Sequence, residues 1–251
     1  MDGEMQIKFM TYNVWSRDDV VVYERMKVTG DLVGQHSPDV ILFQEITPYI
    51  HSIFESFPWW KDYHCSPVPP EEQTVNHPFC LMLSKLPMES YARWKFGTSP
   101  TGKCYLEADI TPGSMKPIRI ATTQLECPVP PASKHAVSAL NSGDNVVFGG
   151  DMSWDDKADL PFPLPEGWGD AWGKLRRGTA ESDSWTFCSL WVEQARDFNG
   201  YKFPNLGDYT LKTIELIGGG HLEIYCTKDS SHYVRMVPSC HRGLVLTILP
   251  K

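Results

Sequence analysis

Short runs of apolar residues, each about as long as a β-strand, recur along the chain and predict most of its secondary structure. Ile7 to Tyr12 predicts a first strand that ends at a polar residue, Asn13. Val40 to Phe43 is continuously apolar and follows a Ser-Pro-Asp turn signal, which is typical of a buried strand. Further strands are predicted at Phe79 to Leu83, Cys104 to Ile110, Ile118 to Thr123, Val146 to Phe148, Lys212 to Ile217, His221 to Cys226 and Leu244 to Leu249.

Helical patterns are fewer. Val20 to Gln35 has apolar residues at helical spacing among charged ones, which predicts a surface helix. Thr47 and Pro48 predict the N-cap and first position of a second helix, running to about Phe57. Ser133 to Leu140 allows a third helix of about two turns. The Pro-rich segments 67–70, 128–131 and 161–165 are predicted to be loops. Many strands with few helices predict two packed sheets with helices outside them, in a single domain over residues 6–250.

Composition and charge narrow the class of protein. With 251 residues, 41% of them hydrophobic, the chain is long enough to bury a large core. The net charge of -8 argues against a long electrostatic grip on nucleic acid, although holding one DNA end needs few contacts. No apolar run reaches the roughly 18 residues that span a membrane, and no secretory signal is visible. Seven cysteines without regular spacing fit a reducing compartment, so we expect a soluble intracellular protein that is not secreted.

Polar clusters at strand ends contain the residue types that hydrolyse a phosphodiester. This reaction needs a hard cation, an oriented water molecule and hydrogen-bond donors for the phosphate oxygens. Glu45 follows a buried strand, and one well-placed carboxylate can suffice to hold Mg²⁺. Asp151, which follows two glycines, is a candidate to orient the water. Asn13 is a candidate to hold Glu45, and His241 is a candidate donor to a phosphate oxygen.

Each of these residues also has a purely structural explanation. Glu45 suits the solvent-facing start of a loop, and Asn13 and Asp151 suit turns. A single histidine such as His241 is more often structural than catalytic. The recurrence of all four residues at strand ends is therefore the observation that predicts a site.

The order of the clusters, Thr-Tyr-Asn, Phe-Gln-Glu, Gly-Asp-x-x and Ser-x-His, resembles the endonuclease/exonuclease/phosphatase superfamily. The surrounding sequence is most similar to the plant tyrosyl-DNA phosphodiesterase 2 group of that superfamily, over nearly the whole chain. The matching stretches are residues 11–15, 37–48, 83–87, 147–156, 163–168 and 170–172, and the similarity weakens at 128–141 and 188–205. The resemblance implies an α/β fold, a four-layer α/β sandwich of two packed mixed β-sheets with helices on the outer faces.

The resemblance also implies roles for particular residues. Glu45 would be the ligand of Mg²⁺, with Mn²⁺ as an alternative metal. Asp151 and His241 would be the catalytic residues of the Gly-Asp-x-Asn and Ser-Asp-His motifs, and Asn13 would assist them. The implied partners are DNA 5′ ends that carry a tyrosine adduct and the topoisomerase-derived peptide attached to them. The implied location is the nucleus, with the cytoplasm as an alternative.

Four further positions are candidates for substrate binding: Gln124, Ser153, Trp154 and Trp185. Gln124 replaces a histidine of the family and brings no positive charge, and Ser153 replaces the Asn of Gly-Asp-x-Asn. Tryptophans such as Trp154 can stack on unpaired bases, or they can simply pack in the core or loops. Cys240 replaces the Asp of Ser-Asp-His, and a neutral thiol supplies no negative charge unless its pKa is strongly depressed.

These departures from the family pattern leave several hypotheses open. The first is a Mg²⁺-dependent phosphodiesterase that is weakened, since each lost donor or acid–base group costs roughly 10²–10⁴ in rate. The second is a catalytically inactive relative that binds DNA ends, a phosphorylated ligand or a protein. The third is the same fold acting on another phosphate substrate. A cysteine nucleophile at Cys240 would need a depressed pKa, and no Cys-x-x-Cys spacing indicates zinc. The family's Asp-Arg pair is not found; only a reversed pair, Arg196-Asp197, lies near its place.

Overall fold

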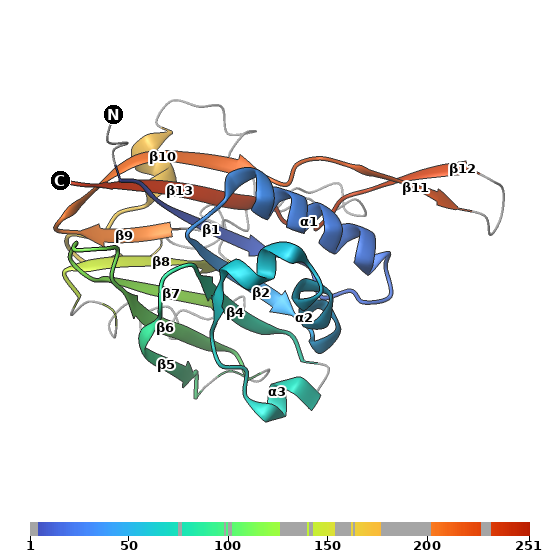
Figure 1. Ribbon diagram of the computed structural model, residues 1–251, viewed down its shortest axis with the longest axis horizontal. Helices are drawn as coiled ribbons and strands as arrows, with labels where there is room; N and C mark the ends of the chain where they lie inside the picture. The colour runs from blue at the N-terminus through green and yellow to red at the C-terminus, as the bar shows by residue number, and fades with distance from the viewer. Residues whose placement is uncertain are drawn as a thin grey trace.

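The structure is a computed structural model and describes residues 5–74, 77–97, 99, 102–125, 140, 143–153, 162, 164–176, 202–226 and 232–251. Two β-sheets pack face to face (Figure 1). The six-stranded sheet has the order β10-β13-β1-β2-β4-β3, with β10 at Tyr209–Ile217, β13 at Gly243–Pro250, β1 at Ile7–Asn13, β2 at Val40–Ile46, β4 at Phe79–Ser84 and β3 at His64–Cys65. The five-stranded sheet has the order β5-β6-β7-β8-β9, with β5 at Glu89–Lys95, β6 at Cys104–Ile110, β7 at Ile118–Gln124, β8 at Asn145–Asp151 and β9 at Lys202–Leu206.

The alternation of side chains along the strands divides the core into layers. In β2, Val40 and Leu42 face the other sheet, whereas Ile41 and Phe43 face outward, because successive side chains of a strand point to opposite faces. Gln44 also faces inward. Its amide donates to the hydroxyls of Thr11 in the same sheet and Thr122 in the other, at 3.2 and 3.0 Å. This buried contact joins the two sheets close to the ends of their central strands.

Helices cover the outer face of the six-stranded sheet (Figure 1). α1 (Val22–His36) and α2 (Pro48–Glu55) pack on it together with the short helix η1 (Pro58–Asp62). The two other described helices are short: α3 (Pro70–Thr74) and α5 (Ala171–Leu175), of which α5 contacts β10 and β9. Over the outer face of the five-stranded sheet, buried residues outside the strands include Leu140, Met152 and Trp168, and the partly buried Phe162 and Leu164 pack against them. The architecture is therefore α/β with two packed mixed sheets, as predicted.

Each sheet contains one parallel pair of strands at its centre, and its other pairs are antiparallel. β1 and β2 are parallel, with Asn13 opposite Gln44. β7 and β8 are parallel, with Gln124 opposite Asp151. Because the carboxyl ends of parallel strands lie at the same edge, each pair brings two strand ends together. The two pairs also contact each other across the sandwich, β1 against β8 and β2 against β7.

The strands predicted from apolar runs are all present, and several elements differ from the prediction in their ends. β8 extends through the two glycines to Asp151, and α1 begins at Val22 after a turn. α2 is shorter than predicted and ends at Glu55, because Pro58 disfavours helical backbone at the residue before it. The segment 67–70 was predicted to be a loop, but Pro70 begins α3. The predicted helix at 133–140 lies outside the described residues except for Leu140.

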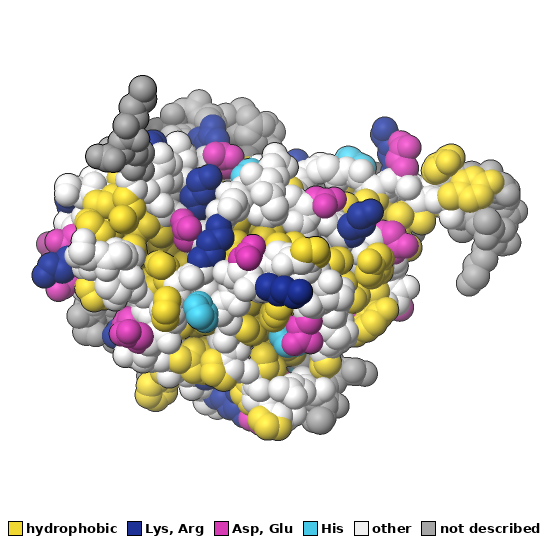
Figure 2. Space-filling view, in the orientation of Figure 1, with side chains coloured by type: hydrophobic (Ala, Val, Ile, Leu, Met, Phe, Trp, Pro, Cys, Tyr) yellow, Lys and Arg dark blue, Asp and Glu magenta, His cyan; other side chains and the backbone are white. Residues whose placement is uncertain are grey.

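A hairpin of β11 (Leu222–Cys226) and β12 (His232–Met236) projects from the sandwich (Figure 1). Its residues Tyr225 and Tyr233 are exposed, with their ring centroids 5.1 Å apart. On the face shown in Figure 2, Lys and Arg side chains are interspersed with Asp and Glu and form no continuous basic surface. Among the described residues, no helix has the length and apolar character needed to cross a bilayer.

Candidate active site

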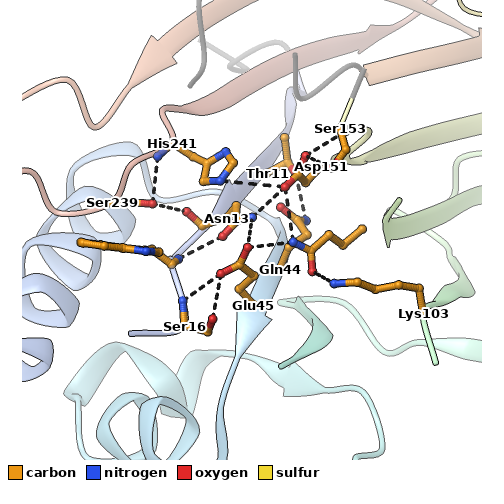
Figure 3. A network of polar contacts seen from close by, with 12 residues as sticks. Thr11, Asn13, Ser16, Gln44, Glu45, Lys103, Asp151, Ser153, Ser239 and His241 are labelled. Carbon is orange, nitrogen blue, oxygen red and sulfur yellow. Dashed lines mark hydrogen bonds and ion pairs between the residues drawn. The ribbon is translucent and has the colours of Figure 1, made fainter. Parts of the chain in front are cut away.

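Four strand ends, two from each sheet, meet at one edge of the sandwich and carry the predicted site residues (Figure 3). Asn13 ends β1 and Glu45 lies at the end of β2. Gln124 ends β7 and Asp151 ends β8. All four side chains belong to one hydrogen-bonded network, so the structure brings together residues that are far apart in the sequence.

Two amide side chains bridge two carboxylates at the centre of this network. Asn13 Nδ2 donates to Glu45 Oε1 at 3.0 Å and to Asp151 Oδ2 at 2.8 Å. Gln124 Nε2 donates to the same two oxygens, at 2.8 and 3.5 Å. One carboxylate comes from each sheet, and their negative charges are held close together by N–H donors. Such a pair attracts a cation.

The backbone around Glu45 directs its side chain into the site. Its φ of 60° lies in the left-handed region, and the pairing of β2 with β4 is irregular between Phe43 and Ile46. Ser16 donates to Glu45 Oε2 from both its main-chain N and its Oγ, each at 2.9 Å. Burial alone raises the pKa of Glu45, but hydrogen bonds from Asn13 and Ser16 and the charge of nearby His241 together bring it below its ordinary value.

The lowered pKa makes Glu45 a source of pH-dependent stability. A carboxyl whose pKa is lower in the folded than in the unfolded protein stabilises the fold above its unfolded pKa. That stabilisation is lost as the pH falls through the folded pKa. In metal-free buffer, we expect the wild type to exceed Glu45→Gln in free energy of unfolding near neutral pH, and this excess to shrink as the pH falls below about 4.5. Urea unfolding at several pH values checks this, and a constant difference would contradict it.

Asp151 is held at the end of β8 and is only 5% exposed. Its Oδ1 accepts hydrogen bonds from the N and Oγ of Ser153, at 2.9 and 3.3 Å, and Ser153 has a left-handed φ of 48°. The preceding Gly150 lies against β7, where an added Cβ would stand 2.2 Å from the main-chain oxygen of Thr123. The glycine is therefore required by close approach of the backbone, as its sequence context predicts.

Replacing Gly150 by alanine is expected to push β8 away from β7 and displace Asp151. Because the added Cβ would clash with backbone atoms, which cannot rotate away, we expect the free energy of unfolding to fall by about 1–3 kcal/mol. The matched control is Gly34→Ala in α1, where an added Cβ meets nothing within 4 Å. That control should be neutral or more stable by up to about 1 kcal/mol, because alanine favours helix over glycine. Equal denaturation midpoints for the two variants would show that β8 adapts without strain.

His241 closes the site from the segment before β13. Its Nε2 lies 4.0 Å from Asp151 Oδ2, and the ring is 9% exposed. Its main-chain N donates to Ser239 Oγ at 3.1 Å, and that hydroxyl donates to the main-chain oxygen of Asn13 at 2.7 Å. Glu45, Asp151 and His241 offer ligand atoms that all lie within 4.8 Å of one another. Two carboxylates and an imidazole form a donor set that fits a divalent cation.

Cys240 lies beside the carboxylates without contributing negative charge. Burial and then the charge of Glu45 raise its pKa to about 12, so the thiol stays protonated and is a poor nucleophile. Nearby, Arg25 of α1 is fully buried and donates to the main-chain oxygens of Trp15 and Val14, at 2.6 and 3.3 Å. Burial lowers the pKa of Arg25 to about 10. Its Nε is buried without a hydrogen-bond partner.

The predicted and observed site residues do not coincide completely. Trp154, Trp185 and the reversed pair Arg196-Asp197 lie outside the described residues. Sequence reasoning missed four residues that support the network: Ser16, Arg25, Lys103 and Ser239. Only Ser239 had a sequence signal, because it belongs to the recognised Ser-x-His cluster.

Comparisons with known proteins bear on the fold. No family model matches the sequence, and neither does any curated protein. Solved structures match over nearly the whole chain. Truncated TDP2, a tyrosyl-DNA phosphodiesterase 2, from Caenorhabditis elegans has a TM-score of 0.78 at 16% identity, covering 98% of both chains. D. rerio TDP2 complexed with a single-strand DNA product has a TM-score of 0.75 at 18% identity, covering 98% of this chain and 99% of that one.

A more distant protein agrees with these matches. An endonuclease/exonuclease/phosphatase family protein from Bacteroides thetaiotaomicron has a TM-score of 0.77 at 12% identity, covering 99% of both chains. Identities this low establish the fold alone. The chain therefore has the fold of the endonuclease/exonuclease/phosphatase proteins, and structures of TDP2 are among those that it matches over nearly its full length.

Proposed function

We propose that the protein is a Mg²⁺-dependent phosphodiesterase that hydrolyses the bond between a DNA 5′ phosphate and a tyrosine, in the repair of topoisomerase-linked DNA. The observation that carries this proposal is the network in which Asn13 and Gln124 join Glu45 to Asp151, with His241 beside them. The network supplies carboxylates for a cation and N–H donors for a phosphate.

Glu45 would hold the cation, with Asp151 close enough to contribute a second carboxylate. When bound, a divalent cation would neutralise charge on the phosphate oxygens as the reaction proceeds. Mg²⁺ is favoured because carboxylate oxygens are hard ligands, and Mn²⁺ accepts both carboxylate and imidazole.

The protein's own residues would position the reactants. Asp151 would accept a hydrogen bond from the attacking water and take up its proton. His241 Nε2 would donate to a phosphate oxygen, where negative charge builds up in the transition state. Asn13 Nδ2 and Gln124 Nε2 each donate to both carboxylates in this structure, and each would turn one N–H from Asp151 Oδ2 to a phosphate oxygen when the substrate binds. The water oxygen forms a bond to phosphorus while the bond from phosphorus to the tyrosine oxygen breaks. The tyrosine leaves as a phenol once it is protonated, and the DNA keeps a 5′ phosphate.

Two observations support a DNA end as substrate. The clusters and the sequence around them resemble the tyrosyl-DNA phosphodiesterase group, and a TDP2 structure of the same fold is complexed with a single-strand DNA product. The net charge of -8 suits contacts with one end better than a grip along a duplex. A nuclear location is part of the same proposal.

The direct test is turnover of a 5′-phosphotyrosyl oligonucleotide with Mg²⁺ and with EDTA, alongside Glu45→Gln as the matched inactive variant. We expect turnover only with metal and only with Glu45 present. Unchanged turnover in Glu45→Gln would remove Glu45 from the reaction. An oligonucleotide with another 5′ adduct, or with an abasic site, reports whether the same site prefers a different phosphate ester.

A second function is favoured by one observation, the uncharged thiol of Cys240 beside the two carboxylates. On this alternative, the protein binds a DNA end, a phosphorylated ligand or a protein without hydrolysis. Binding of the 5′-phosphotyrosyl oligonucleotide in the absence of any turnover would favour it over the phosphodiesterase.

A further inference from the structure

Lys103 reaches the candidate active site through Gln124. It lies directly before β6 and is partly buried, and its Nζ donates a hydrogen bond to Gln124 Oε1 (Figure 3). In the antiparallel pairing of β6 with β7, Tyr105 lies opposite Thr123, so Lys103 is one residue away from the position that faces Gln124. The same glutamine donates from Nε2 to Glu45 Oε1 at 2.8 Å. Lys103, Gln124 and Glu45 therefore form a continuous chain of hydrogen bonds.

This series of hydrogen bonds fixes which way the side-chain amide of Gln124 points. An ammonium group can only donate, so the atom of Gln124 that faces Lys103 must be its oxygen. The NH₂ group is then turned toward the two carboxylates, where a donor is needed. Without Lys103, only the two carboxylates would hold the amide in this orientation, and its oxygen would lose the charged donor behind it.

Lys103 does not form an ordinary surface ion pair with any described residue. Within the described residues, no carboxylate lies within ion-pair distance of Lys103, whereas Arg119 is paired with Asp109 at 2.9 Å further along the same sheet. The positive charge of Lys103 is instead directed at an uncharged side chain of the site. A charged donor also polarises the amide that it binds and strengthens the hydrogen bonds made at its other end.

We propose that Lys103 is a positioning residue that orients and polarises Gln124 for the phosphate and supplies the positive charge that glutamine itself lacks. The proposal rests on the proposed function, since it gives the phosphate as the group that Gln124 Nε2 contacts during the reaction. The pair Lys103–Gln124 combines one N–H donor facing the site with a cation directly behind it. A protonated imidazole would offer the same combination in a single side chain.

The experiment compares Lys103→Met, which keeps length but removes charge, with Lys103→Arg, which keeps charge. The control is Lys116→Met, an exposed lysine that precedes β7 at the end opposite Gln124. With the 5′-phosphotyrosyl oligonucleotide, we expect Lys103→Met to lower kcat/KM by roughly tenfold to a hundredfold, the range for losing one charge-assisted hydrogen bond. Lys103→Arg should recover most of the loss, and Lys116→Met should match the wild type.

Coupling separates a positioning role from an independent one. If Lys103 acts through Gln124, the double variant Lys103→Met/Gln124→Met should be no worse than Gln124→Met alone. Additive losses, or a Lys103→Met variant with unchanged kcat and KM, would overturn the inference while leaving the proposed function intact.

A structural measurement keeps the inference testable whatever the catalytic result. The side-chain amide signals of Gln124 in an NMR spectrum can be assigned by their disappearance in Gln124→Met. They should shift in Lys103→Met and stay close to their wild-type positions in Lys116→Met; unmoved signals would overturn the positioning role. If the wild type neither hydrolyses nor binds the oligonucleotide, the proposed function fails, and the phosphate role of Lys103 fails with it.

Discussion

Asp151→Asn is expected to lower turnover of a 5′-phosphotyrosyl oligonucleotide by roughly 10²–10⁴, the range for losing a general base. The side chain keeps its shape but loses its charge, so it can no longer take up a proton from water. The variant also loses a hydrogen-bond acceptor. In the wild type, Oδ2 accepts hydrogen bonds from Asn13 and Gln124, and Oδ1 accepts one from the main-chain N of Ser153. An asparagine offers one oxygen, so one of these donor groups would face an NH₂, at a cost of about 1–3 kcal/mol in stability.

The matched control is Asp144→Asn, an exposed residue directly before β8, the strand that ends at Asp151. Its turnover and its denaturation midpoint should stay close to those of the wild type. Steady-state kinetics and urea unfolding of both variants check the prediction. Wild-type kcat in a folded Asp151→Asn variant would exclude Asp151 as the group that handles the proton.

Cys240→Asp is expected to tighten Mg²⁺ binding by at least about tenfold and to raise turnover. Burial and then the nearby charges of Glu45 and Asp151 raise the pKa of Cys240, so an aspartate there would add a third carboxylate beside the other two. A unit charge at about 4–8 Å contributes roughly 2–4 kcal/mol at an effective dielectric constant of about 20. The buried guanidinium of Arg25, which donates hydrogen bonds to main-chain oxygens, would gain a further acidic neighbour.

The effect of Cys240→Asp on thermal stability should change sign when the metal is added. In EDTA, three clustered carboxylates repel one another, so Cys240→Asp should melt at a lower temperature than the wild type. Saturating Mg²⁺ should reverse the order, because ligands that bind only the folded state stabilise it. Cys240→Asn, which has the same shape without charge, is the control. Equal Mg²⁺ affinities for the aspartate and asparagine variants would show that charge at this position is unimportant.

Apolar patterning was sufficient to predict the central strands of both sheets, but it missed three of the four described edge strands. β2 and β8 are buried on both faces, and each contains a continuous apolar run, Val40 to Phe43 and Val146 to Phe148. β5 is an edge strand whose residues are exposed or half-buried, and its mixed sequence carries no such run. β9 contains Pro204, which normally argues against a strand, but it pairs only with β8 at the edge, where proline is tolerated. These two strands were therefore missed, as were β12 and the two-residue edge strand β3.

In the candidate site, residues placed by a single strand end could be predicted from the sequence, whereas residues placed by contacts between distant segments could not. Asn13, Glu45 and Asp151 were recognisable because each follows a strand, and the strand end alone determines their location. Lys103 was not recognisable, because its contact with Gln124 depends on the register of two strands. Arg25 was missed because a charged residue on a predicted surface helix is expected to face solvent, whereas it is fully buried.

The strand order also has a consequence for folding. β13, which follows the other described strands in the sequence, lies inside the six-stranded sheet between β10 and β1, which precedes them all. One edge of β1 therefore has no partner until β13 folds onto it. His241, directly before β13, joins the two carboxylates only at that step. A folding intermediate in which β13 is still undocked thus has no assembled site, even where the carboxylate pair has already formed.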